Sequence, residues 1–169
     1  MKKILIILMF VVRLTYANSQ VIAGYGVSNM EMPSFGTNDM VAENIFAGLE
    51  NRYQINDKDT LVISGLLSSN RKDQMSYLNE LELQVTFEKM FKKQHHFGVG
   101  FHITHLLDEK FDDIEFAGSG FGLNLTYKYQ IFPMISFNAQ LYSNSYEIQS
   151  TTDSKFNIHT ARTFISIYP

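Results

Sequence analysis

The sequence contains no cysteine and no tryptophan among its 169 residues. The lack of cysteine excludes disulfide bonds and thiolate metal or redox sites. No basic block is present and the net charge is −3, so nucleic acid is not expected as a partner. No apolar run reaches the about 20 residues that a membrane-spanning helix needs. Hydrophobic residues still make up 45% of the chain, which is enough for one folded domain with a core.

The first residues, MKKILIILMFVVRLTYANSQ, have the pattern of a secretory signal peptide. Two lysines are followed by an apolar run over residues 4–12 and by the small residues Thr15 and Ala17, which occupy the two key positions for a cleavage after Ala17. We therefore predict a signal peptide over residues 1–17. A single domain over residues 18–169 then follows.

The rest of the chain shows no long helical periodicity. Polar and apolar residues alternate along it instead. In YLNELELQVTFEKM, residues 77–90, one alternate set is Leu, Glu, Glu, Gln, Thr, Glu and Met, and the other is mostly apolar. A strand places alternate side chains on opposite faces, so this pattern predicts a two-faced strand. Eight such stretches are expected, at residues 20–30, 44–55, 60–69, 77–90, 96–107, 116–131, 134–146 and 156–168.

The connections between these stretches differ in length. Residues 56–59 (NDKD) and the segment around Pro133 are tight turns, whereas other links, such as residues 29–43, are longer and more polar. Short turns at one end and long loops at the other are typical of outer-membrane barrels. The pattern predicts an all-β fold, an eight-stranded antiparallel up-and-down transmembrane β-barrel with its short turns in the periplasm.

The composition of the two faces distinguishes a membrane barrel from a soluble one. The polar faces carry mainly Gly, Ser, Thr, Asn and Gln, which suit the narrow bore of a barrel better than a soluble exterior rich in Lys and Glu. Aromatic residues lie near strand ends on the apolar faces, as in interfacial girdles: Tyr53, Tyr77, Tyr127 and Tyr129. These features favour the membrane barrel; a soluble, lipocalin-like periplasmic ligand binder is the alternative.

The strand charges are expected inside the barrel. A basic residue facing the middle of the bilayer costs about 2–4 kcal/mol, so Arg162 should point inward and place Ala161, Thr163, Ile165 and Ile167 on the lipid. Buried charges need partners, which predicts a paired, hydrogen-bonded plug in the bore. The predicted lumen network consists of Glu50, Arg52, Glu80, Glu82, Glu88, His102, Lys128 and Arg162.

Two segments resemble the small eight-stranded outer-membrane barrels of the OmpA, OmpX and opacity-protein type. They are FAGLENRYQINDKDTLVISG, a strand, tight turn and strand, and GFGLNLTYKYQIFPMISFNAQLYS, a Gly-rich strand, turn and strand. The resemblance covers residues 20–168. It implies a monomer in the outer membrane of a Gram-negative bacterium, in contact with outer-membrane lipid and lipopolysaccharide. It also implies a role in adhesion, serum resistance or envelope integrity, with no cofactor.

Candidate chemistry is sparse. The histidines of HHFGVGFHITH do not converge on one face closely enough for a zinc site, so no metal is expected. The enzymatic alternative is a lipid-modifying barrel similar to a lipid A deacylase, which needs a nucleophile, a histidine and an acid. The chain offers His102, His105, Ser119, Asp108 and Glu109 as loose pieces without a recognised motif. We therefore predict no catalytic residues and no enzyme.

The loops are the expected partner-facing surface, with host or neighbouring-cell surface ligands as candidate partners. The acidic loop DEKFDDIE has no glycine at a bend, which favours a solvated charge run over a calcium site. The first loop carries apolar residues that would form a binding patch if exposed. The predicted loop surface consists of Met30, Met32, Phe35, Met40, Asp108, Glu109, Asp112 and Asp113.

Overall fold

A computed structural model of the chain describes residues 19–31, 40–72, 77–107, 110–111, 114–148 and 155–167. Eight long antiparallel strands make up nearly all of this described part. They are β1 (Ser19–Glu31), β2 (Met40–Gln54), β3 (Asp59–Arg71), β4 (Tyr77–Lys92), β5 (His95–Leu106), β7 (Ile114–Phe132), β8 (Ile135–Ile148) and β9 (Lys155–Ile167). All eight predicted strands are confirmed. The predicted signal peptide lies outside the described residues.

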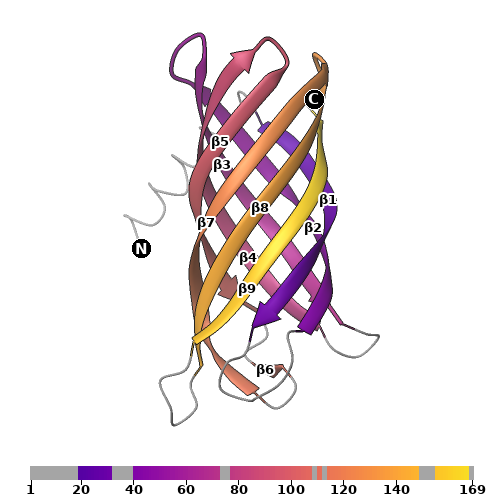
Figure 1. Cartoon of the computed structure of the whole chain (residues 1–169), viewed down its shortest axis with the longest axis vertical. Coiled ribbons are helices and arrows are strands. Elements are labelled where there is room, and N and C mark those ends of the chain that lie inside the picture. Colours follow the sequence, from indigo (N-terminus) through magenta and orange to yellow (C-terminus); the bar gives the residue numbers. More distant parts are fainter. Residues whose placement is uncertain are drawn as a thin grey trace, which may run out of the picture.

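The eight strands close into a barrel (Figure 1). Each strand pairs antiparallel with its neighbours in the chain, β5 pairs with β7, and β1 pairs with β9 to complete the circle. Closure leaves no free strand edge among them. A further two-residue strand, β6 (Lys110–Phe111), pairs with the first two residues of β7. The acidic segment predicted as a loop therefore contains a small hairpin.

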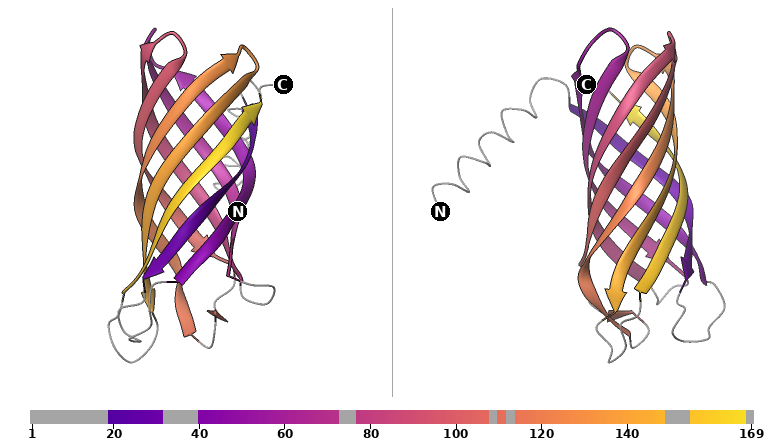
Figure 2. Two further views of the ribbon diagram at one scale, coloured as in Figure 1. Left: turned by 45° about the vertical axis from the view of Figure 1, so that its right-hand side comes forward. Right: turned by 60° about the vertical axis from the view of Figure 1, so that its left-hand side comes forward.

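The two ends of the barrel differ. Residues 55–58, 93–94 and 133–134 form short connections at one end, which is the upper end in Figure 1, and β1 begins and β9 ends there. The strands tilt strongly between this turn end and the opposite, loop end (Figure 2). In the fold class expected from the sequence, the turn end is periplasmic and the loop end is extracellular.

The NDKD turn shows how local sequence sets a connection. The side chain of Asn56 accepts hydrogen bonds from the backbone N–H groups of Lys58 (2.9 Å) and Asp59 (3.0 Å). Its amide nitrogen donates to a carboxylate oxygen of Asp59 at 2.7 Å. Asparagine stabilises turns by such bonds to nearby backbone groups. The turn that joins β2 and β3 is thus encoded within four residues.

Alternate side chains point into the bore and out of the barrel, and the outer set is the apolar one. In β7, Leu123 is 67% exposed, whereas its neighbour Asn124 is 2% exposed. In β9, Arg162 is buried and Ala161, Thr163, Ile165 and Ile167 are exposed, as predicted. A lipocalin-like soluble barrel has the reverse arrangement, so that alternative is wrong. In the described part of the chain, no helix has the length and apolar character needed to cross a membrane.

Candidate functional site: the hydrogen-bonded interior

The centre of the bore contains a fully buried ion pair between β9 and β4. The guanidinium of Arg162 donates two hydrogen bonds, each 3.1 Å long, to the two carboxylate oxygens of Glu82. Both side chains are 0% exposed. Such bidentate charge-assisted pairs are strong and fix the orientation of both groups. The pair holds together two strands that are not adjacent in the barrel wall.

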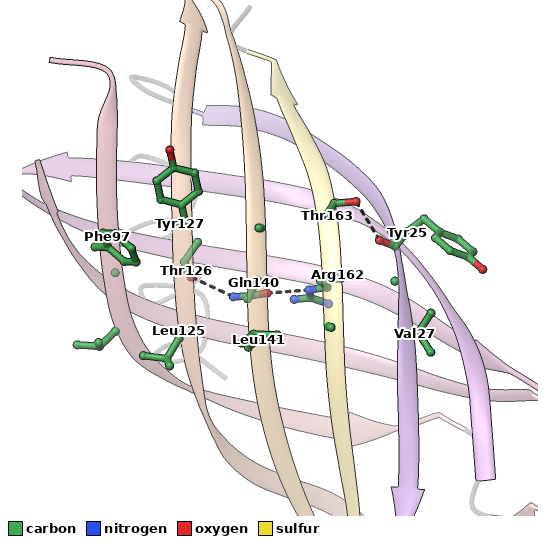
Figure 3. Close-up of a pocket in the computed structure, with 15 residues that line it drawn as sticks. Tyr25, Val27, Phe97, Leu125, Thr126, Tyr127, Gln140, Leu141, Arg162 and Thr163 are labelled. Carbon is green, nitrogen blue, oxygen red and sulfur yellow. Dashed lines mark hydrogen bonds between the residues drawn. The ribbon is translucent and has the colours of Figure 1, made fainter. Parts of the chain in front are cut away.

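Two glutamines complete this central layer. Arg162 Nε donates to Gln140 Oε1 at 2.7 Å, and Gln140 Nε2 donates to Gln84 Oε1 at 3.0 Å. Gln84 Nε2 in turn donates to Glu82 at 2.8 Å, which closes a ring of four side chains. Figure 3 shows Gln140 between Arg162 and Thr126. The side-chain polar atoms of Glu82 and Gln140, the two residues that contact the guanidinium, are therefore all hydrogen-bonded within one network.

Aromatic rings and glycine backbones pack around the buried guanidinium. Its central carbon lies 4.1 Å from the ring centroid of Phe46 and 4.6 Å from that of Tyr142, close enough for cation–π attraction. Gly26 lies opposite Arg162 in the β1–β9 register and leaves room for it. The cavity that remains beside this layer measures about 10 Å³, near the lower limit for one water molecule. The interior is therefore filled at this level.

A second layer lies nearer the loop end and is centred on Glu80. Tyr146 donates its phenolic hydrogen to one carboxylate oxygen of Glu80 at 2.6 Å, and Ser68 donates to the other at 3.1 Å. Thr104 donates to the Tyr146 oxygen at 2.7 Å. Glu80 is completely buried. Its two oxygens are thus held by hydroxyl groups from two other strands, β8 and β3, and Thr104 on β5 supports the Tyr146 hydroxyl.

A third layer lies at the turn end. Arg52 forms ion pairs with Glu50, at 2.9 Å, and with Glu88 on β4. Lys128 is 1% exposed, and its charge interacts with those of these three residues. Arg52 and Lys128 line a cavity of about 270 Å³ that opens at this end, together with His96. Two acidic and two basic side chains therefore offset one another at the mouth of the bore.

All eight residues of the predicted lumen network point inward. The structure joins Arg162 with Glu82 and groups the four charges at the turn end, whereas Glu80 is held by hydroxyl groups. His102 is 0% exposed, and its ring packs edge-on against Tyr142 with centroids 4.8 Å apart. Gln84, Gln140 and Tyr146 also belong to the network, and they were not among its predicted members. They belong to the same inward-facing alternate sets as the charged residues or other polar residues of their strands, and this pattern in the sequence could have identified them.

The predicted loop surface needs one correction. Met30 is part of β1 and only 1% exposed, because it falls on the inward-facing set of that strand, so it contributes nothing to an exposed patch. Met40 is the first residue of β2. The remaining members of the predicted surface lie outside the described residues: Met32, Phe35, Asp108, Glu109, Asp112 and Asp113.

One polar pair lies on the outer face near the loop end. His105 Nδ1 and Ser119 Oγ are 3.2 Å apart, and the two residues are register partners on β5 and β7. Both side chains are exposed. Over the described ranges, no group of three or more His, Asp or Glu side chains is placed to hold a metal ion. The outer face thus presents a serine and a histidine in contact.

Two solved structures that share this fold are a surface protein and an attachment protein. Neisserial surface protein A is 14% identical with a TM-score of 0.56, and the match covers 86% of this chain and 95% of that one. Ail, the attachment invasion locus protein of Yersinia pestis, is 9% identical with a TM-score of 0.58, covering 90% and 98%. No protein-family model matches the sequence, and no curated protein matches it significantly.

The fold and the outer surface together define the class of protein. In a closed barrel, the backbone N–H and C=O groups form hydrogen bonds between strands and need no water. The apolar side chains outside contact the acyl chains of the lipid, and the charged side chains are paired inside. The same fold in the surface proteins above agrees with this arrangement. The chain therefore has the fold of the small eight-stranded outer-membrane β-barrels.

Proposed function

We propose that the protein is a structural or surface-binding barrel whose specific contacts are made at its extracellular end. The observation that carries this proposal is the filled bore. The buried Arg162–Glu82 pair and its glutamine ring occupy the centre, where a channel would need an open path. A barrel with a filled interior acts through its ends and its outer face. We expect the barrel to function as a monomer surrounded by outer-membrane lipid and lipopolysaccharide.

The proposed binding role concerns adhesion to host or neighbouring cells. Ail, which shares the fold, is named as an attachment invasion protein, and this name supports the choice without identifying a ligand for the present chain. Loops on a rigid barrel are a common location for binding residues. The segments that leave the loop end, residues 32–39, 73–76 and 149–154, are the parts to test.

Replacing residues 32–39 with an Asn-Gly turn is expected to abolish adhesion and to leave the barrel folded. β1 and β2 pair as far as Met30 and Met40, so Glu31 and the two inserted residues form a three-residue hairpin loop beyond this pair. Adhesion is measured with bacteria that display the variant, and folding is measured by heat-modifiable migration on a gel. The matched control replaces residues 149–154 in the same way.

The two replacements separate the possible outcomes. Loss of adhesion only with residues 32–39 assigns the contact to the first loop. Unchanged adhesion with both replacements, in bacteria that otherwise adhere, would contradict the proposed role of these loops. A steady ion conductance of the purified barrel in a planar bilayer would instead favour a channel.

A second candidate function rests on the contact between His105 and Ser119. A histidine within hydrogen-bond distance of a serine can act as the general base that activates the hydroxyl group for attack on an ester. On the outer face near the loop end, such a pair would meet the acyl esters of outer-leaflet lipid. The described residues offer no carboxylate to orient His105, which is why we place this lipid-hydrolysing function second.

The barrel is expected to release no fatty acid from lipopolysaccharide or phospholipid vesicles, and Ser119→Ala should behave as the unaltered protein does. Release is measured by mass spectrometry of the free acids. Ser143→Ala is the matched control, because Ser143 is also exposed on the outer face and lies opposite His159 in register. Release that disappears in Ser119→Ala and persists in Ser143→Ala would establish the enzymatic function instead.

A further inference from the structure

A shallow groove of about 550 Å³ crosses the outer face over β5, β7, β8, β9 and β1 (Figure 3). In the register of these strands, Ala139 and Thr163 lie between Tyr127 and Tyr25, so two small side chains separate two large ones. Ala161 continues the depression in the next row. The groove thus results from small residues placed side by side within a belt of large ones.

The lining of the groove is apolar. The Thr163 hydroxyl donates to the backbone oxygen of Tyr25 at 3.5 Å, so this polar group is directed to the protein and not to the groove. A surface of this kind within the membrane belt is in contact with acyl chains. The other apolar side chains that line it are Val27, Phe97, Val99, Leu125 and Leu141, and the inward-facing residues Thr126, Gln140 and Arg162 also line it.

Aromatic contacts connect the groove with the turn end of the barrel. The rings of Phe97 and Tyr127, which both line the groove, have centroids 5.4 Å apart. The ring centroid of Phe91, which lies next to the β4–β5 turn, is 5.4 Å from that of Phe97. His95 Nδ1 is 2.8 Å from the Tyr127 hydroxyl oxygen, which fixes that ring at the edge of the groove. Aromatic residues in such positions are characteristic of the membrane interface.

The exposed charge beside this aromatic cluster is positive. Lys92 and Lys93 directly follow Phe91, and both are exposed at the β4–β5 turn. The sequence has no aspartate or glutamate from residue 89 to residue 107 or from residue 116 to residue 146, which covers β5 and most of β7 and β8. Basic side chains next to a membrane attract anionic headgroups. The apolar groove therefore matches an acyl chain of an anionic phospholipid, and the two lysines match its negatively charged headgroup.

We propose that this groove binds one phospholipid of the periplasmic leaflet, with an acyl chain against Ala139 and Ala161 and the anionic phosphate at Lys92 and Lys93. The short turns mark this end as periplasmic, where the leaflet consists of glycerophospholipid. The site lies at the opposite end from the loops and is independent of the function proposed for them. Phe91, Phe97 and Tyr127 contact the lipid where its headgroup joins its acyl chains.

The proposal is tested by native mass spectrometry of the barrel released from nanodiscs that contain phosphatidylglycerol and phosphatidylethanolamine. The unaltered protein should retain one phosphatidylglycerol. Ala139→Leu with Ala161→Leu fills the groove and should abolish retention. Lys92→Gln with Lys93→Gln should weaken phosphatidylglycerol binding by about thirtyfold and remove the preference over phosphatidylethanolamine.

Two variants serve as matched controls. Ala47→Leu enlarges an outward-facing alanine on β2, outside the groove, and Lys58→Gln removes an exposed lysine at the neighbouring turn. Both should retain lipid as the unaltered protein does, and a heat-modifiable gel shift verifies that every variant is folded. Equal retention by the groove variant and by Ala47→Leu would overturn the proposal. A second copy of the chain in the groove in place of the phospholipid would overturn it as well.

Discussion

Replacing Glu82 with glutamine is expected to lower the free energy of unfolding by about 3–5 kcal/mol. The substitution keeps the shape of the side chain but leaves the charge of Arg162 without a partner at 0% exposure. Glu80, on the same strand, is held by Tyr146 and Ser68 and so does not replace the missing carboxylate. The measurement is urea unfolding of the barrel in lipid vesicles, followed by tyrosine fluorescence.

Two comparison variants define this effect. Glu31→Gln changes an exposed contact, in which the Glu31 carboxylate lies 3.5 Å from His159 Nε2 and the two side chains are 42% and 45% exposed. It should cost less than about 1 kcal/mol. Glu82→Gln combined with Arg162→Gln removes both buried charges and should recover part of the loss. If Glu82→Gln were as mild as Glu31→Gln, the interior would be hydrated, and the filled bore on which the proposed function rests would be contradicted.

Replacing Gly26 with alanine is expected to destabilise the barrel by about 1–3 kcal/mol, because the site has no room for even one methyl group. A Cβ atom at this position would lie 2.4 Å from the backbone oxygen of Ala161 and 2.5 Å from Cβ of Arg162. Neither neighbour is the free end of a flexible side chain, so the strands must move apart where Arg162 is held. The free energy of unfolding in vesicles measures the effect.

Gly65→Ala is the matched control for this substitution. Gly65 lies on the outward face of β3, and a Cβ atom there would have no atom within 4 Å. This variant should be neutral or slightly stabilising, since alanine restricts the unfolded chain more than glycine does. Equal effects of Gly26→Ala and Gly65→Ala would show that the close approach between β1 and β9 is absent from the folded barrel.

The sequence was sufficient to predict the strands and the orientation of their faces. Alternation in a segment such as residues 77–90 determines which side chains share a face, and the cost of placing Arg162 in lipid selects the inward set. The tight turn at Asn56 is local, so it too could be recognised without the rest of the chain. These features depend on near neighbours in the sequence.

The contacts inside the bore could not be predicted in the same way. Alternation shows that Gln84 and Gln140 point inward. These two residues are 56 positions apart in the chain, and their contact depends on the stagger of the strands around the barrel. Phe46 and Tyr142 lie on the inward set although they are aromatic, because they pack on Arg162. Met30 was assigned to the loop surface although the predicted strand over residues 20–30 ends on it, and in the structure this strand runs to Glu31 with Met30 on its inward-facing set.

The most direct test of the inverted arrangement of faces is spin-label accessibility in vesicles. The chain has no cysteine, so single cysteines at Phe121, Leu123 and Leu125 on β7 can be labelled without background. An apolar face in contact with lipid predicts frequent collisions with oxygen and few with a water-soluble nickel complex, and Lys93→Cys at the turn should show the opposite. Labels at the three β7 positions that collide freely with the nickel complex would contradict the membrane barrel.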